Sequence, residues 1–231
     1  MKKELKKKNK KILAYIPARS GSKGIKNKNI LLNKKKPLIL HTLKFAKSLN
    51  NVFPFVSTDN PKYLDIVKKY HRNHFEYLRP KKYAQDNSLI QSGLKHALEW
   101  LKKEKNMEFD NIILLQPTSP NRSVKFFNEI LKKYLKQKYQ SLITVKPSID
   151  NPEIMVNMKT TSKWNFLVKY NFQKGGRQYY KKFFKLDGNF YIFSNKFFRK
   201  NNSFFKENVT HIEINYEKNN IDIDTKMDLN N

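Results

Sequence analysis

Residues 12–29 read ILAYIPARSGSKGIKNKN, and this stretch decides how the rest of the chain is interpreted. It opens with the apolar run Ile12 to Ile16, typical of a short buried strand, which a proline then ends. Gly21 and Gly24 follow among basic and hydroxyl residues, and glycine lets a loop fold tightly against a ligand. Successive backbone N–H groups in such a loop can bind an anion. The stretch therefore indicates a strand followed by a phosphate-binding loop, as at the start of an α/β domain.

Basic side chains of this loop are candidate phosphate ligands. Arg19 offers a planar fork of donors and Lys23 offers a point charge, with Ser22 beside it. The loop matches neither G-x-x-x-x-G-K-[ST] nor G-x-G-x-x-G, so it is not a Walker A loop or a dinucleotide-binding fingerprint. From these residues alone, a solvated basic turn is the alternative interpretation, because lysine is abundant throughout the chain.

Outward from this stretch, apolar periodicity predicts alternating strands and helices. Further strands are predicted at 53–57, 75–78, 111–115, 142–145, 190–194 and 211–215, and helices at 40–48, 61–70, 86–103, 123–137 and after Asp228. Such alternation indicates βαβ units in a three-layer α/β domain with a mostly parallel sheet. The candidate ligands directly follow strands, and ligands of such sheets bind outside the carboxyl ends of the strands.

Composition divides the chain and limits its partners. Residues 1–11 contain seven lysines and one glutamate, which predicts a disordered basic tail, and 12–231 form one domain. Segment 147–186 is irregular, aromatic and basic, and is predicted to be an insertion that leaves the main sheet. The net charge of +29 is typical of nucleic-acid binders, but the lysines are scattered, so no nucleic-acid partner is expected.

Other compositional features concern the compartment. No run approaches the ~20 apolar residues of a membrane span. No apolar h-region follows the basic N-terminus, so neither membrane insertion nor secretion is expected. The chain has no cysteine, which excludes disulfides and thiolate sites and fits a cytoplasmic protein.

Two carboxylates near the C-terminus are candidate metal ligands. Asp222 and Asp224 alternate with Ile221 and Ile223, and a strand would direct both carboxylates to one face. A hard cation such as Mg²⁺ fits between them. The alternative is a polar edge strand whose carboxylates pair with lysines. Asp228 is expected to cap or neighbour the final helix.

Four segments, in order, resemble motifs of the acylneuraminate cytidylyltransferase (CMP-sialic acid synthetase) family. They are ARSGSKGIKNKNI, RPKKYAQDNS, LLQPTSPNR and IDIDTKMDL, and the resemblance runs from about Ile12 to Leu229. It implies a Rossmann-like, glycosyltransferase-A-like nucleotidyltransferase fold. It also implies transfer of CMP from CTP to the anomeric hydroxyl of a sialic-acid-like nonulosonic acid, with release of pyrophosphate, for lipopolysaccharide or capsule synthesis.

The resemblance also implies roles for particular residues. The nucleotide-binding positions are Arg19, Ser22, Lys23, Asn29 and Arg79; the sugar-binding positions are Gln116, Arg177, Gln178, Asp187 and Tyr191; and Asp222 and Asp224 hold the catalytic Mg²⁺. Catalysis then falls to Arg19, Lys23 and the two metal-binding aspartates. The family's counterpart of 147–186 is an arm that packs on a second subunit and completes its active site, which implies a homodimer.

Several points stay open at the level of sequence. Asp187 stands where the family usually has asparagine, and Asp86 could cap the long helix or bind a ligand. The general base is not identified, although one of the paired aspartates or a metal-bound hydroxide is a candidate. The sugar could be N-acetylneuraminate, legionaminate or pseudaminate.

The sequence allows two alternative functions. The first alternative is a CMP-Kdo-type synthetase, which ranks lower because GSKGIKNKN resembles the acylneuraminate branch more than the Kdo branch. The second is a non-catalytic nucleic-acid binder, which has no need of paired carboxylates.

Overall fold

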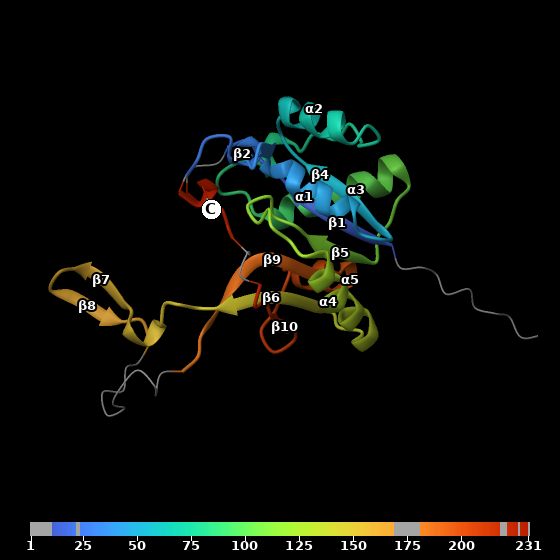
Figure 1. Ribbon diagram of the computed structural model, residues 1–231. Coiled ribbons are helices and arrows are strands. Elements are labelled where there is room, and N and C mark those ends of the chain that lie inside the picture. Colours follow the sequence, from blue (N-terminus) through green and yellow to red (C-terminus); the bar gives the residue numbers. More distant parts are fainter. Residues whose placement is uncertain (1–10, 22–23, 169–180, 218–220, 226, 231) are drawn as a thin grey trace, which may run out of the picture.

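A mixed six-stranded sheet forms the centre of the molecule (Figure 1). The computed structural model describes residues 11–21, 24–168, 181–217, 221–225 and 227–230. The sheet order is β10-β6-β9-β5-β1-β4, and every strand except β9 runs in the same direction. The bounds are β1 Ile12–Pro17, β4 Val52–Ser57, β5 Asn111–Leu114, β6 Ser141–Pro147, β9 Phe184–Ser194 and β10 His211–Ile214.

The predicted first strand is confirmed as the middle of the parallel part of this sheet. Strand β1 pairs with β4 on one side and β5 on the other, in parallel. Its side chains alternate between two buried faces: Ile12, Ala14 and Ile16 enter one core, while Leu13 and Tyr15 enter the other. A strand buried on both faces reads as a continuous apolar run, which is why the sequence revealed it.

Helices cover both faces of the sheet and make three layers, as predicted. Apolar side chains of α1 (Leu38–Lys47), α2 (Pro61–Tyr70) and α4 (Val124–Gln137) fill the first core. Those of α3 (Ile90–Lys105) and α5 (Asn195–Asn201) fill the second. The predicted starts of α2 and α4 are right because Asn60 and Ser123 cap them, accepting hydrogen bonds from the backbone N–H groups of Lys62 and Phe126.

Two predicted elements differ in the structure. Residues 75–78 form no strand; they make an isolated bridge from Leu78 to Thr58, because the chain there covers Phe55 with aromatic side chains beyond the sheet edge. The long helix begins at Ile90 rather than Asp86, with Leu89 at its N-cap. Asp86 is therefore not a helix cap, and its carboxylate accepts a hydrogen bond from Arg19 instead.

The chain between β6 and β9 leaves the main sheet and carries a hairpin (Figure 1). Its hairpin consists of β7 (Val156–Thr160) and β8 (Lys163–Phe166), which follow the short helix η3 (Pro152–Ile154). Strand β9 already begins at Phe184, inside the predicted insertion. The remaining short elements are η1 (Lys28–Ile30), β2 (Leu32–Asn33), β3 (Lys36–Pro37), η2 (Lys81–Tyr83) and η5 (Met227–Asn230).

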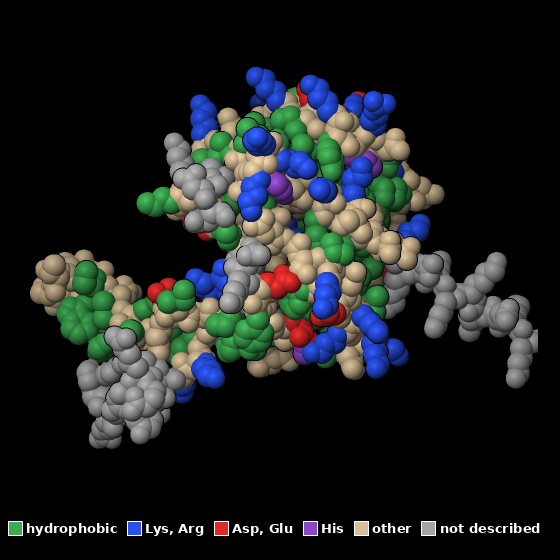
Figure 2. All heavy atoms as spheres, in the orientation of Figure 1, with side chains coloured by type: hydrophobic (Ala, Val, Ile, Leu, Met, Phe, Trp, Pro, Cys, Tyr) green, Lys and Arg blue, Asp and Glu red, His purple; other side chains and the backbone are tan. Residues whose placement is uncertain are grey.

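The surface matches the scattered charge seen in the sequence. Figure 2 shows Lys and Arg side chains spread over the visible face of the main body rather than gathered in one stripe. Among the described residues, none of the helices has both the length and the apolar character needed to cross a membrane.

A buried histidine beside β4 predicts a stability change with pH. His74 is 5% exposed; its Nε2 accepts the backbone N–H of Val56 at 2.9 Å, and its Nδ1 lies 2.8 Å from the Phe75 carbonyl. Burial lowers the pKa of His74 from 6.5 to about 4, so the folded protein keeps the ring neutral while the unfolded chain takes up a proton below pH 6.5. The contribution of His74 to the free energy of unfolding is therefore fully present above pH 6.5, and it falls by about 3 kcal/mol as the pH decreases to 4.

The measurement is urea unfolding at pH 7 and pH 4 for wild type and His74→Gln, whose side chain does not titrate. Between pH 7 and pH 4, the free energy of unfolding of the wild type should decrease by about 3 kcal/mol more than that of the variant. Equal losses in the two proteins would show that His74 contributes nothing to acid sensitivity.

Candidate active site

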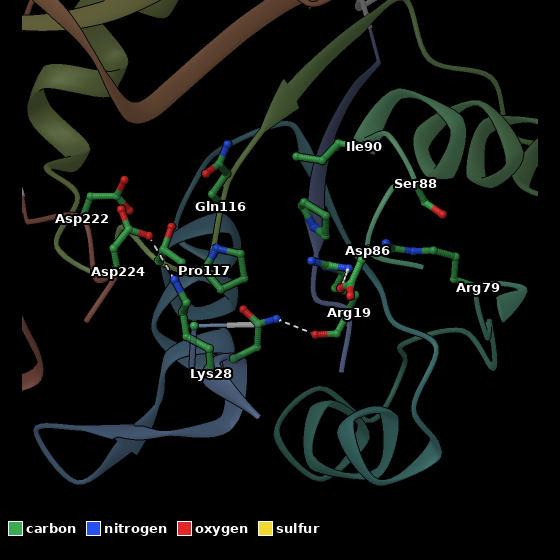
Figure 3. A pocket seen from close by; sticks show the side chains of 14 residues that line it. Arg19, Lys28, Arg79, Asp86, Ser88, Ile90, Gln116, Pro117, Asp222 and Asp224 are labelled. Carbon is green, nitrogen blue, oxygen red and sulfur yellow. Dashed lines mark hydrogen bonds and ion pairs between the residues drawn. The ribbon is translucent and has the colours of Figure 1, made fainter. Parts of the chain in front are cut away.

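A cavity of about 460 Å³ opens at the carboxyl ends of β1, β4 and β5 (Figure 3). It lies where parallel strands present their following loops to a ligand. Most of the predicted site residues within the described part of the chain line it. Its lining comprises Pro17, Arg19, Gly24, Lys28, Asn29, Arg79, Asp86, Ser88, Ile90, Gln116, Pro117, Thr118, Asp222 and Asp224.

The loop after β1 is held in shape from both sides. Asp59, which follows β4, accepts hydrogen bonds from the backbone N–H and the hydroxyl of Ser20, at 2.9 and 2.7 Å. The buried amide of Asn29 donates to the carbonyl of Arg19 at 2.9 Å. The loop is therefore preorganised at its first turn. Ser22 and Lys23, also predicted to bind nucleotide, lie outside the described residues.

Arg19 crosses the mouth of the pocket. Its Nη1 donates to the carboxylate of Asp86 at 2.9 Å and to the carbonyl of Gln85 at 3.0 Å. Its side chain is 31% exposed and that of Asp86 is 47% exposed. Exposed ion pairs are worth only about 0–1 kcal/mol, so an arriving phosphate can displace this contact.

Arg79 is a buried cation at the back of the same pocket. It is 5% exposed, and its guanidinium donates to the hydroxyl of Ser57, at 2.9 Å, and to the carbonyl of Ser57. A Cβ on Gly93 would lie 3.1 Å from the Tyr15 hydroxyl and 3.4 Å from Arg79 Cδ, so the glycine of α3 makes room chiefly for Tyr15, with Arg79 beside it. The Arg79 acceptors among the described residues are uncharged groups, so no carboxylate hydrogen-bonded there neutralises its positive charge.

Asp222 and Asp224 lie side by side on the opposite wall (Figure 3). The predicted strand is absent from residues 221–225; the segment is instead tied down by the Ile223 N–H, which donates to the Thr118 carbonyl at 2.8 Å. Ile223 is buried, while Asp224 is exposed and its carboxylate accepts from Lys28 Nζ at 3.0 Å. Ile221 and Asp222 are both half-buried, so the predicted alternation of apolar and acidic side chains holds only for Ile223 and Asp224.

Asp222 has the features of a cation ligand. Its Oδ1 is buried and has no hydrogen-bond partner among the described residues. Burial raises the pKa of its carboxyl, as does the nearby charge of Asp224, whereas a hydrogen bond from Thr118 lowers it. An unpaired oxygen next to a second carboxylate fits Mg²⁺, which takes one or two carboxylates and keeps several waters. Asp228 lies in the first turn of the short helix η5, and its carboxylate accepts from the N–H groups of Asp224 and Thr225, so it orders this segment.

Two predicted sugar ligands lie outside the cavity lining, and two are not described. Asp187 is 1% exposed, and its carboxylate accepts from Thr144 Oγ1, Asn189 N–H and Asn215 Nδ2 at 2.6–2.9 Å. Tyr191 packs in the second core against Phe204 and Phe205. Arg177 and Gln178 fall in 169–180, outside the described residues.

Asp187 nevertheless belongs to a bulge that touches the site. Strand β9 bulges opposite Thr144 of β6, and Gly188 adopts φ +69°, which a residue with a side chain rarely does. A Cβ at Gly188 would lie 3.4 Å from Asp222 Oδ2. The bulge therefore packs directly against the Asp222 carboxylate.

Two residues of this site were missed by sequence reasoning. Lys28 donates to the carboxylate of Asp224 and to the carbonyl of Ile223, both at 3.0 Å, and so joins the loop after β1 to the C-terminal segment. Arg122 bonds to the carbonyls of Gln116, Ser119 and Asn189. Both lie inside the quoted motifs, but nothing in their spacing distinguished them from other basic residues.

The fold of this chain is also found in solved structures of other proteins. The fold aligns with CMP:2-keto-3-deoxy-manno-octonic acid synthetase complexed with CTP, with a TM-score of 0.67, 16% identity and 95% of each chain covered. It also aligns with 4-diphosphocytidyl-2C-methyl-D-erythritol synthase from Anaerococcus prevotii, with a TM-score of 0.61, 15% identity and 95% of each chain covered. These likenesses confirm the predicted fold class.

Sequence comparison then gives the family. Residues 13–220 match the family described as Cytidylyltransferase, and the chain belongs to it. The chain is 31% identical to CMP-N,N'-diacetyllegionaminic acid synthase of Legionella pneumophila, over 94% of this chain and 93% of that protein. It is 35% identical to N-acylneuraminate cytidylyltransferase of Escherichia coli over 70% of this chain, but this alignment spans only 38% of the E. coli protein's length.

Proposed function

We propose that the protein transfers the cytidylyl group of CTP to the anomeric hydroxyl of a nonulosonic acid and releases pyrophosphate. One observation carries the proposal: a single pocket has Arg19 and Arg79 on one wall and the Asp222–Asp224 pair on the other. Cations on one side suit a triphosphate, and paired carboxylates on the other suit a metal that accompanies it. The names of the relatives, which include sialic, legionaminic and pseudaminic acid cytidylyltransferases, support the same reaction.

The chain's own residues would act mainly by positioning and charge neutralisation, which dominate phosphoryl-type transfers. Arg19 and Lys28 would bind phosphate oxygens of CTP as these displace their present carboxylate partners. Arg79 would supply a fixed positive charge at the inner end of the pocket. Gln116, which follows β5, would orient the acceptor. When bound to Asp222 and Asp224, Mg²⁺ would neutralise phosphate charge and lower the pKa of a nearby hydroxyl.

The test is turnover by the purified full chain with CTP, Mg²⁺ and one acid at a time. The panel holds N-acetylneuraminate, N,N'-diacetyllegionaminate, pseudaminate and Kdo, and mass spectrometry identifies any CMP-sugar. A CMP adduct of one of the first three supports the proposal. A product with Kdo alone would move the protein to the alternative acceptor, and no product with any acid would contradict cytidylyl transfer to this class.

We further propose that the chain works as a homodimer in the cytoplasm through the arm at 147–186. Several large apolar side chains of this arm are exposed, and such patches usually mark interfaces (Figure 2). The most exposed is Ile149, at 97%, and the hairpin adds Val156, Met158 and Trp164 at 47%, 60% and 52%. A hairpin that stands away from its own domain fits packing against a second copy.

Replacing two hairpin residues tests this arrangement. Met158→Ser/Trp164→Ser should convert a dimeric mass to a monomeric one, because it removes apolar area from the interface. Light scattering after gel filtration at micromolar concentration gives the mass. Val209→Ser, which changes an exposed apolar residue of the main body, is the matched control and should stay dimeric. A wild-type protein that is monomeric and fully active would contradict the proposal.

A further inference from the structure

Arg122 is the most heavily engaged cation near the site, although it is not among the residues that line the pocket. Its Nη2 donates to the Gln116 carbonyl at 2.7 Å, and its Nη1 donates to the Ser119 carbonyl and to Thr42 Oγ1. Its Nε donates to the Asn189 carbonyl at 3.1 Å. All three guanidinium nitrogens are therefore used, and the acceptors come from three separate segments of the chain.

Two of these segments hold Asp222 between them. The 116–119 turn contributes the Thr118 carbonyl, which accepts the Ile223 N–H, and the Thr118 hydroxyl, which bonds to the Asp222 carboxylate. The bulge of β9 contributes Gly188, whose backbone lies against Asp222 Oδ2. Ser119 Oγ closes the gap between the segments by donating to the Gly188 carbonyl at 3.3 Å. Arg122 also joins these two segments, because it donates to the Gln116 and Ser119 carbonyls of the turn and to the Asn189 carbonyl of the bulge.

The electrostatic surroundings of Arg122 fit this arrangement. Burial lowers the pKa of its guanidinium to about 9, while Asp187 and Asp222 raise it, so the group stays charged at neutral pH. The rings of Phe45 and Phe190 lie 5.9 Å from its Cζ, within the range of cation–π contacts. A lysine could supply the charge, but only the planar fork of arginine reaches several acceptors in fixed directions.

We propose that Arg122 is a positioning residue for the reaction, which sets the place of Asp222 by fixing the 116–119 turn against the 187–189 bulge. The inference rests on the proposed role of Asp222 in cytidylyl transfer. Since Arg122 is not among the residues that line the pocket, its loss should lower kcat and raise the Mg²⁺ concentration needed for half-maximal rate while CTP affinity is kept. A role in fold stability alone would instead lower the melting temperature and leave kcat of the folded enzyme intact.

The experiment compares Arg122→Lys and Arg122→Met with wild type. Steady-state kcat, KM for CTP, the Mg²⁺ concentration for half-maximal rate, and the melting temperature are measured for each. Manganese binding to the CTP-bound protein, followed by electron paramagnetic resonance, adds a readout that does not depend on turnover. Arg199→Met is the matched control, because Arg199 is exposed and its Nε donates to Asn195 Oδ1 within the same helix, α5.

Arg122→Lys should lower kcat by about 10–100-fold and weaken manganese binding, with little change in KM for CTP. Losses of this size are usual when a group that orients a metal ligand is removed. Arg199→Met should match wild type in every readout. Unchanged kcat and manganese binding in a folded Arg122→Lys protein would overturn the proposal. Absence of turnover in wild type itself would instead contradict the proposed function, so the two failures are distinguishable.

Ser119→Ala keeps the proposal testable if both Arg122 variants fail to fold. It removes the Ser119–Gly188 hydrogen bond with a small change in volume. It should lower kcat severalfold and weaken manganese binding in the same direction, with CTP affinity kept. If kcat and manganese binding of Ser119→Ala matched those of wild type, the contact between the 116–119 turn and the 187–189 bulge would have no role in placing Asp222.

Discussion

Asp222→Asn and Asp224→Asn are each expected to abolish nearly all CTP turnover while the protein stays folded. Each change removes one negative charge and preserves side-chain shape. The buried Oδ1 of Asp222, which has no partner in the described part of the chain, and the adjacent carboxylate of Asp224 would otherwise hold Mg²⁺, whose charge would offset that of the transferring phosphate. Excess Mg²⁺ should restore part of the rate if the loss lies in metal affinity.

The competing explanation is that the pair only balances basic residues such as Lys28, which contacts Asp224. An exposed ion pair of this kind is worth about 0–1 kcal/mol, so its loss would scarcely change the rate. The measurement is initial rate against Mg²⁺ concentration, with circular dichroism as the fold control. Asp65→Asn, on the exposed face of α2, is the matched control and should behave as wild type. Folded variants with an unchanged rate and unchanged Mg²⁺ dependence would rule out the metal role.

Arg19→Ala is expected to raise the activation barrier by about 2–4 kcal/mol, the usual cost of losing one preorganised charge-stabilising group. Arg19 is held at the pocket mouth by Asp86 and its own carbonyl is fixed by Asn29, so its side chain is placed to meet phosphate. Lys23, outside the described residues, carries the same prediction from its place in the loop.

Asp86→Asn separates phosphate binding from a structural role of the ion pair. It removes the anionic partner of Arg19 but leaves the cation free for phosphate, so turnover should stay close to that of wild type. Initial rates at varied CTP concentration, with thermal melts as control, give the comparison. If both Arg19→Ala and Lys23→Ala turned over CTP as fast as wild type, the loop after β1 would have no part in the mechanism.

The sequence predicted much of the fold because the parallel strands are buried on both faces. Continuous apolar runs such as residues 12–16 and 111–115 have few alternative interpretations. Asn60 and Ser123 are cap residues of the favoured types, so the starts of α2 and α4 were also readable. The start of α3 was not, because Leu89 occupies its N-cap and the better capping residue, Asp86, pairs with Arg19.

The site was predictable where a residue follows a strand and unpredictable where tertiary contacts decide. Gln116 and Arg19 lie two residues beyond the ends of β5 and β1, and the structure places both at the pocket. The bulge that turns Asp187 into the core depends on the pairing of β9 with β6, which no local pattern encodes. The roles of Lys28 and Arg122 likewise depend on partners far away in sequence, at Asp224 and Asn189.

The choice among functions follows from the same contacts. The Asp222 Oδ1 is buried, has no partner among the residues that the structure describes, and shares a pocket with two arginines. A metal-assisted transfer from CTP would use such an oxygen as a metal ligand, whereas a nucleic-acid binder has no need of it. The scattered basic side chains of Figure 2 offer no continuous stripe on that face for a phosphate backbone.

Following the two ends of the triphosphate tests the central claim most directly. The full chain is incubated with Mg²⁺, a nonulosonic acid and CTP labelled with ³²P at either the α- or the γ-phosphate. Cytidylyl transfer predicts that the α label appears in the CMP-sugar and the γ label in pyrophosphate, both only when the acid is present. Release of the γ label as orthophosphate, its transfer to the sugar, or loss of CTP at the same rate without the acid would contradict the account.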